Sequence, residues 1–192
     1  MSKIGVKFLT VAVALLFSAS LAAAADKLSA GESRFIKDAA GGGLFEVEMG
    51  KLAQEKAASQ QVKDFAKKMD QDHSKANSEL KQLASTKNVQ IADKLEGKHK
   101  STYDRLAKLS GERFDREYMK TMIDDHKTDV DHFKKEADSA KDPDVKQFAS
   151  KTLPTLEKHL ELAQSTGQQV GANTSEGGIK GFAEKMTDKV KR

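Results

Sequence analysis

The chain is most constrained by a stretch in which apolar or small residues recur at alternating spacings of four and three. The stretch comprises Val62, Ala66, Met69, His73, Ala76, Leu80 and Leu83. Side chains at these spacings share one face of an α-helix, so the pattern predicts a helix that packs against partner helices. One histidine, His73, lies in the middle of this apolar face.

Three further stretches have the same period and complete a set of four predicted long helices. One begins with a capping box formed by Ser29 and Glu32, and another with an N-cap Asp142 followed by Pro143. The remaining helix is expected at about 112–138, after a long connection (85–111) that contains one short helix. The predicted fold class is therefore all-α, a ferritin-like four-helix bundle of two helical hairpins joined by a long connection.

The two ends of the chain differ from this bundle, which we place at 29–166. Residues 1–25 have a positive start, an apolar stretch and a small-residue end, which predicts a secretory signal peptide. The protein is thus expected to be periplasmic or otherwise exported, with no membrane span once the signal is removed. Residues 167–192 are predicted to form a flexible linker and a short basic amphipathic segment, which either contacts an anionic envelope surface weakly or is a solvated tail.

Composition excludes several classes of function. The formal charge is +4, or +2 without Lys3 and Lys7 of the leader, and no dense basic face appears, so nucleic acid is not an expected partner. The chain has no Cys, which excludes disulfides, thiolate metal ligands and Cys nucleophiles. It also lacks a phosphate-binding glycine loop and a Gly-x-Ser-x-Gly elbow, so we assign no catalytic residues and favour a non-enzymatic role over an enzyme, without deciding between them.

One polar residue falls on the apolar face of each predicted helix: Glu46, His73, His126 and His159. At the helical rise of 1.5 Å per residue, each would lie roughly 15 to 21 Å from the same end of a bundle about 40 Å long. They could therefore meet at one level, where burial without partners would cost several kcal/mol. Imidazole and carboxylate together suit Fe, Zn, Cu, Mn or Ni, so these four residues are predicted to bind a divalent transition metal.

Three aspartates are secondary candidates for the same site. Asp70 precedes His73 by three residues, a spacing used in metal-binding bundles. Asp72 and Asp125 adjoin His73 and His126 and could orient the imidazole rings. The alternative is a metal-free, hydrogen-bonded polar cluster that only fixes the helix register.

Several blocks of sequence resemble a known family. They are Glu46-Val47-Glu48-Met49-Gly50-Lys51-Leu52-Ala53, the run from Phe65-Ala66 to Asp72-His73, Ser110-Gly111 followed by Phe114-Asp115-Arg116-Glu117-Tyr118, and Thr152-Leu153-Pro154-Thr155-Leu156 with His159. In this order they resemble the exported bacterial family called domain of unknown function 4142, which is grouped with the ferritin-like superfamily. The resemblance covers about 35–163 and implies a ferritin-like fold and an envelope location, but no established reaction.

The chain departs from the di-iron pattern of ferritins, in which two helices supply a Glu and two supply Glu-x-x-His. Asp70 stands in place of one of these glutamates, and Leu156 stands three residues before His159, where another carboxylate would be. A complete di-iron centre with ferroxidase or catalase activity is therefore not expected. The two functions that stay open are metal binding and a non-catalytic role as an envelope or stress-related interaction protein.

Overall fold

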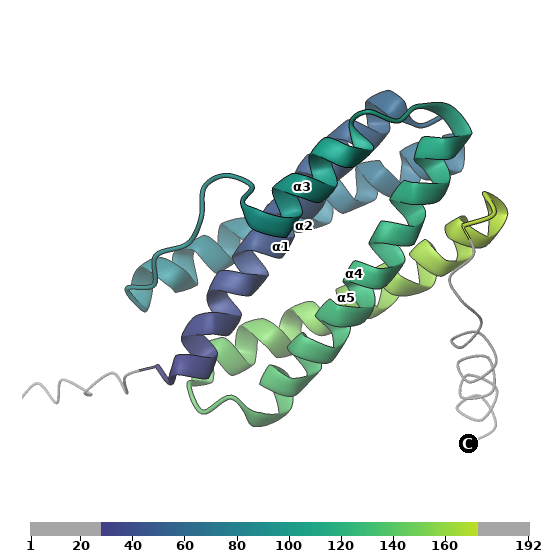
Figure 1. Cartoon of the computed structure of the whole chain (residues 1–192). Coiled ribbons are helices and arrows are strands. Elements are labelled where there is room, and N and C mark those ends of the chain that lie inside the picture. The colour runs from purple at the N-terminus through teal and green to yellow at the C-terminus, as the bar shows by residue number, and fades with distance from the viewer. Residues whose placement is uncertain (1–27, 173–192) are drawn as a thin grey trace, which may run out of the picture.

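The computed structural model describes residues 28–172, which form five α-helices (Figure 1). Their bounds are α1 Ala30–Lys56, α2 Gln60–Thr86, α3 Gly97–Leu106, α4 Gly111–Ser139 and α5 Pro143–Gln169. No strand occurs in this part of the chain, which confirms the predicted all-α class. The predicted leader, 1–25, and the end of the predicted tail, 173–192, lie outside the described residues.

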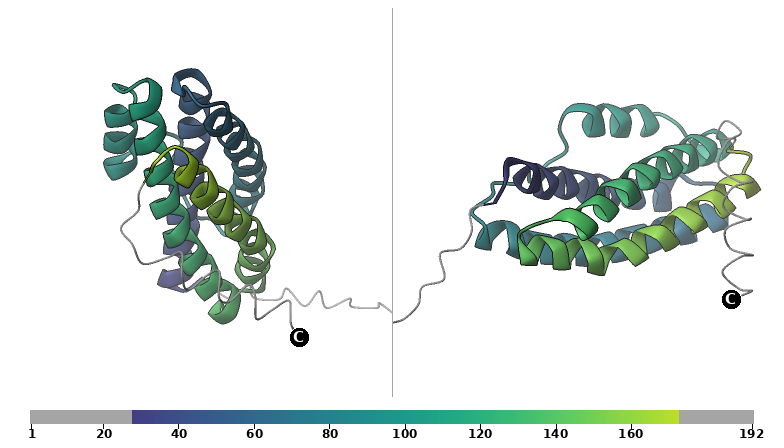
Figure 2. Two further views of the ribbon diagram at one scale, coloured as in Figure 1. Left: turned by 90° about the vertical axis from the view of Figure 1, so that its right-hand side faces the viewer. Right: turned by 90° about the horizontal axis from the view of Figure 1, so that it is seen from below.

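The four long helices form two antiparallel hairpins, α1 with α2 and α4 with α5 (Figures 1 and 2). Between the hairpins, α2 packs beside α5 and α1 packs beside α4. The connection from α2 to α4 returns along the outside of the bundle, and its short helix α3 lies against α1 and α4. This is the predicted layout of two hairpins and one long connection.

The predicted capping box at the start of α1 also ties this helix to the second hairpin. The Ser29 N–H donates to Oε2 of Glu32 at 2.9 Å, and the Glu32 N–H donates to Oγ of Ser29 at 3.2 Å. The other oxygen of Glu32 accepts the backbone N–H groups of Lys141 and Asp142, each at 2.8 Å. Burial alone would raise the pKa of Glu32, but these hydrogen bonds lower it to about 2. A single carboxylate therefore joins the start of α1 to the turn between α4 and α5.

The last helix begins as predicted and ends later than predicted. Oδ1 of Asp142 accepts the N–H groups of Asp144 and Val145 at 3.0 and 3.1 Å, so Asp142 is the N-cap. At the other end α5 passes the expected boundary at 166 and continues to Gln169. Gly171 has a φ of 69°, and the N–H of Ala172 donates to the carbonyl of Gly167 at 2.8 Å, as in a Schellman cap. Composition did not predict this extension, because the residues of the last turn are small or polar, as in a flexible linker.

The core consists of two apolar clusters separated along the bundle axis. On α2, one cluster holds residues up to Met69 and the other begins at Leu80. On α4, the corresponding residues are Ile123 and Phe133. The interval between the clusters contains His73 on α2 and His126 on α4. The fold thus places buried polar side chains in a layer between two apolar ones.

None of the described helices combines the length and the apolar character that crossing a membrane requires.

Candidate metal centre

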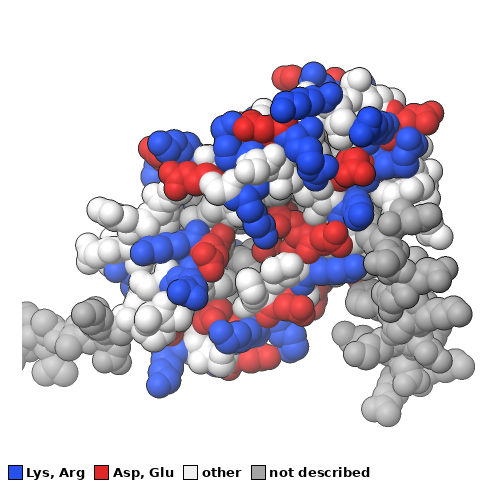
Figure 3. Space-filling model, viewed as in Figure 1, with Lys and Arg blue, Asp and Glu red and all other residues white. Residues whose placement is uncertain are grey.

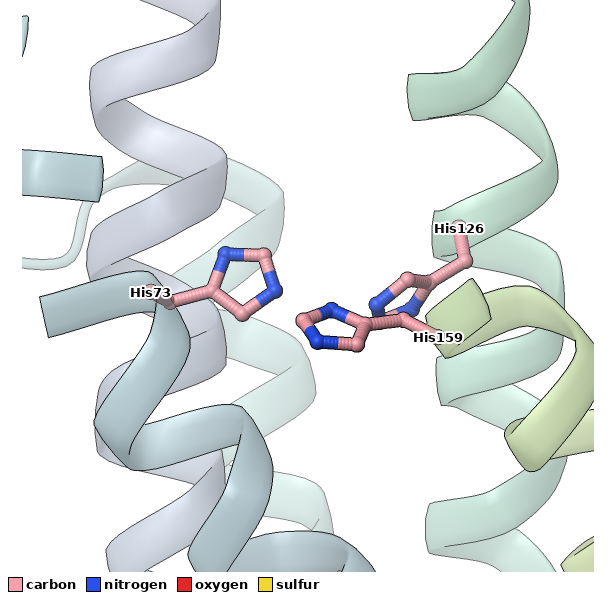
Figure 4. Close-up of side chains that lie close together, drawn as sticks. All are labelled: His73, His126 and His159. Carbon is pink, nitrogen blue, oxygen red and sulfur yellow. The ribbon is translucent and has the colours of Figure 1, made fainter. Parts of the chain in front are cut away.

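Three histidine rings meet in the middle of the bundle, from α2, α4 and α5 (Figure 4). His73, His126 and His159 are 5%, 0% and 1% exposed. Their ring centroids are separated by 5.7 Å (His73–His126), 5.2 Å (His73–His159) and 5.5 Å (His126–His159). One nitrogen of each ring lies within 4.8 Å of a nitrogen of each of the others, which is close enough for one metal ion to contact all three after small shifts.

In two of the rings, one nitrogen is fixed by an acceptor and the other has no partner. Nδ1 of His126 donates to the carbonyl of Met122 at 2.9 Å, and Nε2 of His159 donates to Oδ2 of Asp72 at 2.8 Å. A carbonyl and an ionised carboxylate only accept, so these bonds place the ring protons on those two nitrogens. The lone pairs therefore reside on Nε2 of His126 and Nδ1 of His159, both buried and without a hydrogen-bond partner among the described residues.

Glu46 of α1 adjoins the other side of the histidine cluster. Its Oε2 lies 2.8 Å from Nδ1 of His73, and its Oε1 lies 3.1 Å from Nδ1 of His126. Neither contact has the alignment of a hydrogen bond, so both oxygens of this fully buried carboxylate are unsatisfied within the described structure. Because Nδ1 and Nε2 lie on different edges of an imidazole, a carboxylate beside Nδ1 is displaced from an ion bound at Nε2. The free nitrogen of His73 is also Nε2.

Burial determines the charge of these groups. It lowers the pKa of His73 and of His159 to about 4, and it lowers the pKa of His126 as well. The three imidazoles are therefore neutral at neutral pH, and no proton has to leave before a metal binds. Burial acts in the opposite direction on Glu46 and raises the pKa of its carboxyl group. For Asp72, partial burial alone would raise the pKa, but hydrogen bonds from Lys68 and His159 lower it, which keeps Asp72 an acceptor.

A group of three carboxylates adjoins the histidines. Glu46, Asp125 and Asp129 each place one oxygen within 4.8 Å of an oxygen of the other two. Asp125 and Asp129 are partly buried, and burial raises the pKa of both. Asp129 is not among the residues predicted from the sequence. The available signal was its spacing, since it follows Asp125 by four residues and His126 by three and so shares their face of the helix.

The structure brings all but one of the residues predicted for the metal site together in the middle of the bundle. Glu46, His73, His126 and His159 share the buried layer, with Asp72 behind His159 and Asp125 beside Glu46. Asp70 is not part of this layer. Its two oxygens accept from Oγ of Ser74 and Nε2 of Gln54, each at 3.4 Å, on the side of α2 that faces α1 near Gly50.

Comparison with solved structures places the fold among known helical bundles. A DUF305 fragment from Deinococcus radiodurans superposes with a TM-score of 0.65 at 13% identity, covering 74% of this chain and 98% of that chain. A DUF305 protein from Streptomyces coelicolor gives 0.65 at 14% identity, with 77% and 97% covered. CopM in its Cu(I)-bound form gives 0.60 at 18% identity, with 72% and 96% covered. At these identities the likeness concerns the fold alone.

Comparison by sequence identifies the family. No curated protein matches the chain. The family model described as "Domain of unknown function (DUF4142)" matches residues 17–166, which is most of the chain and all but the last turn of the helical bundle. The chain therefore belongs to the DUF4142 family.

Proposed function

We propose that this protein binds one transition-metal ion through Nε2 of His73, Nε2 of His126 and Nδ1 of His159. The observation that supports the proposal is that these three buried nitrogens lack hydrogen-bond partners and belong to rings that converge from three helices. Leaving a buried polar atom unsatisfied costs about 1–3 kcal/mol. A bundle that places three such atoms together needs a species that satisfies them all.

A metal ion meets this requirement better than water. With the ring protons of His126 and His159 held by Met122 and Asp72, the facing nitrogens of these rings act as acceptors. When the ring proton of His73 is on Nδ1, the nitrogen 2.8 Å from Oε2 of Glu46, the free nitrogens of all three rings are acceptors. A water molecule has two hydrogens to donate, so it satisfies two of them. A cation accepts a lone pair from each.

The donor set defines the class of metal. Neutral imidazoles suit Zn²⁺, Cu, Fe and Ni, and three of them leave a tetrahedral ion one position for water or another ligand. CopM, whose fold is similar, has a Cu(I)-bound form, which is compatible with copper as the ion here. Asp72 and the Met122 carbonyl would hold two rings in the ligating tautomer, as the outer partners of metal-binding histidines do. Glu46, beside two Nδ1 atoms, would offset the charge of the ion.

We further propose that the metal is acquired outside the cytoplasm, after removal of residues 1–25. The support is the leader pattern of the sequence, with Lys3 and Lys7 before an apolar stretch and Ala23-Ala24-Ala25 before Asp26. The mass of the protein isolated from the periplasm tests this step. It should correspond to a chain that begins at Asp26, and a full-length mass would contradict export by cleavage.

Titration of the metal-free mature chain with Zn²⁺ or Co²⁺ tests the metal site. We expect one ion per chain, and at a free metal concentration of about 100 Kd a stabilisation of about 3 kcal/mol. That corresponds to a rise in Tm of roughly 5–10 °C. The substitution His126→Ala should weaken binding at least about 100-fold. His132→Ala is the matched control, because His132 lies on the same helix but is exposed, and it should leave binding unchanged.

Two outcomes would contradict the proposal. One is that metal leaves the Tm of the wild-type chain unchanged, which would favour a metal-free polar cluster that fixes the helix register. The other is that His126→Ala and His132→Ala bind alike. Circular dichroism verifies that His126→Ala is folded, and His159→Gln, which retains a buried polar side chain, provides a second variant for the same comparison.

A further inference from the structure

We infer that the carboxylates of Glu46, Asp125 and Asp129 form a second cation site, of oxygen donors, next to the three histidines. One oxygen of each carboxylate lies within 4.8 Å of an oxygen of the other two. This spacing allows a single divalent ion to draw all three together. The inference extends the proposed function, since Glu46 would adjoin both ions, but it depends on different residues.

The strongest support comes from Glu46 itself. This side chain is 0% exposed, and neither of its oxygens has a hydrogen bond from the described residues. Oδ2 of Asp125 is likewise buried without a partner. A carboxylate can accept from several directions, so Glu46 can contact the Nδ1 atoms of His73 and His126 and still offer a lone pair to an ion. Two of the three acids therefore bring unsatisfied oxygens to the same place.

The surrounding charges do not neutralise this group. No Lys or Arg within residues 28–172 forms an ion pair with any of the three carboxylates. Lys98 on α3 acts on Asp125 and Asp129 only from a distance. Three ionised carboxylates without a direct counter-ion would repel one another, and burial together with this repulsion raises their pKa values. A divalent cation that displaces the bound protons would relieve the same repulsion.

The site has routes to solvent on the side of the aspartates. Asp125 and Asp124 line a hollow of about 250 Å³ between α3 and α4. Asp129 borders a second hollow, of about 430 Å³, between α1 and α4. Figure 3 shows acidic side chains near the centre of the face on which α3 and α4 lie. A hydrated cation could therefore approach the aspartates and exchange part of its water for carboxylate oxygens.

The donor chemistry distinguishes the two sites. Oxygen ligands suit hard divalent cations such as Mn²⁺ and Mg²⁺, whereas the neutral imidazoles suit softer transition metals. The second site should consequently take Mn²⁺ when the histidines already hold Zn²⁺. Its ligands would come from α1 and α4, which are contributed by different hairpins. Occupation of this site would fasten the two hairpins together.

Electron paramagnetic resonance of Mn²⁺ added to the mature chain with one equivalent of Zn²⁺ tests the inference. The wild-type chain should bind one Mn²⁺, and Asp129→Asn should weaken this binding at least about tenfold. The same variant should retain the visible spectrum of Co²⁺ bound at the histidines. Asp131→Asn is the matched control, since it removes the same charge from an exposed position two residues away on α4 and should bind Mn²⁺ like the wild type.

The inference would be overturned if Asp129→Asn and wild type bound Mn²⁺ equally, or if Asp131→Asn lost as much affinity as Asp129→Asn. Thermal unfolding of Asp129→Asn verifies its fold, and Asp125→Asn serves as the second variant. If the wild-type chain bound no Co²⁺ at the histidines but bound Mn²⁺ in a way that depends on Asp129, the proposed function would be refuted and the carboxylate site would be supported. If it bound Co²⁺ at the histidines but its Mn²⁺ binding did not depend on Asp129, the carboxylate site would be refuted and the proposed function would be supported.

Discussion

Two glycines of α1 should differ in their effect on stability when each is replaced by alanine. Both lie inside the helix, where Ala is favoured over Gly by about 1 kcal/mol. At Gly41 the nearest atom to an added Cβ is Nδ1 of His99 at 3.8 Å, an ordinary contact. At Gly50 the added Cβ would lie 2.8 Å from the backbone carbonyl oxygen of Ala66 and 3.1 Å from the backbone N of Asp70. The second substitution therefore forces α1 and α2 apart.

The expected magnitudes follow from these distances. Gly41→Ala should raise the free energy of unfolding by about 1 kcal/mol, the full helix-propensity gain. Overpacking typically costs about 1–3 kcal/mol, so after the same gain Gly50→Ala should change the free energy of unfolding by between zero and about −2 kcal/mol. The two variants should thus differ by roughly 1–3 kcal/mol. For a domain of this size, the difference corresponds to about 2–12 °C in Tm.

Urea unfolding of the metal-free variants, followed by circular dichroism, measures both values. A Gly50→Ala variant at least as stable as Gly41→Ala would show that the helices separate without cost, and would refute the close packing of α1 on α2. Because Gly50 lies about one turn beyond Glu46, Gly50→Ala should also weaken metal binding, whereas Gly41→Ala should not.

Three other predictions concern single side chains. The pKa of Glu32 is lowered to about 2, so its ionised carboxylate contributes on the order of 3 kcal/mol to the free energy of unfolding above the unfolded pKa near 4.5, and this contribution is lost as pH falls towards 2. Acid unfolding should therefore begin at higher pH in Glu32→Gln than in the wild type. Acid transitions at the same pH in both proteins would contradict this role. Tyr118 has a buried hydroxyl without a partner among the described residues, so Tyr118→Phe should leave the free energy of unfolding in urea unchanged or raise it by about 1 kcal/mol. A decrease of more than about 1 kcal/mol would show that this hydroxyl makes a hydrogen bond. Asp72→Asn should weaken Zn²⁺ binding about 10- to 100-fold, because it releases the ring of His159, whereas Asp70→Asn should leave Zn²⁺ binding unchanged. Equal affinities of the two variants in a zinc titration would refute the role given to Asp72.

The apolar period and the helix caps were sufficient to predict the bundle. Alternating spacings of four and three identified the inward faces, and the side chains of Ser29 and Asp142 marked two helix starts that the structure confirms. The four polar residues on those faces lie in one buried layer. Each is at a similar distance from the same end of the bundle, so they come to the same level along its axis when the hairpins pack side by side.

Side-chain direction and close approach could not be predicted in the same way. Periodicity places Glu46 on the inner face, but only packing determines that its carboxylate meets the Nδ1 edges of two rings. At Gly43 an added Cβ would meet the side chain of Asn77, and at Gly50 it would meet the backbone of α2, and neither neighbour follows from the period of the sequence. Asp129 was not predicted, although it shares the helix face of Asp125 and His126, because it becomes partly buried only when α1 packs on α4.

X-ray absorption spectroscopy of the zinc-loaded mature chain tests the central claim most directly, because it identifies the atoms bound to the ion. Our account predicts three imidazole nitrogens at about 2.0–2.1 Å. It also predicts that His126→Ala, loaded under the same conditions, loses this signature. A spectrum with only oxygen neighbours, or an imidazole signature that survives His126→Ala, would contradict the assignment of the three histidines as the metal ligands.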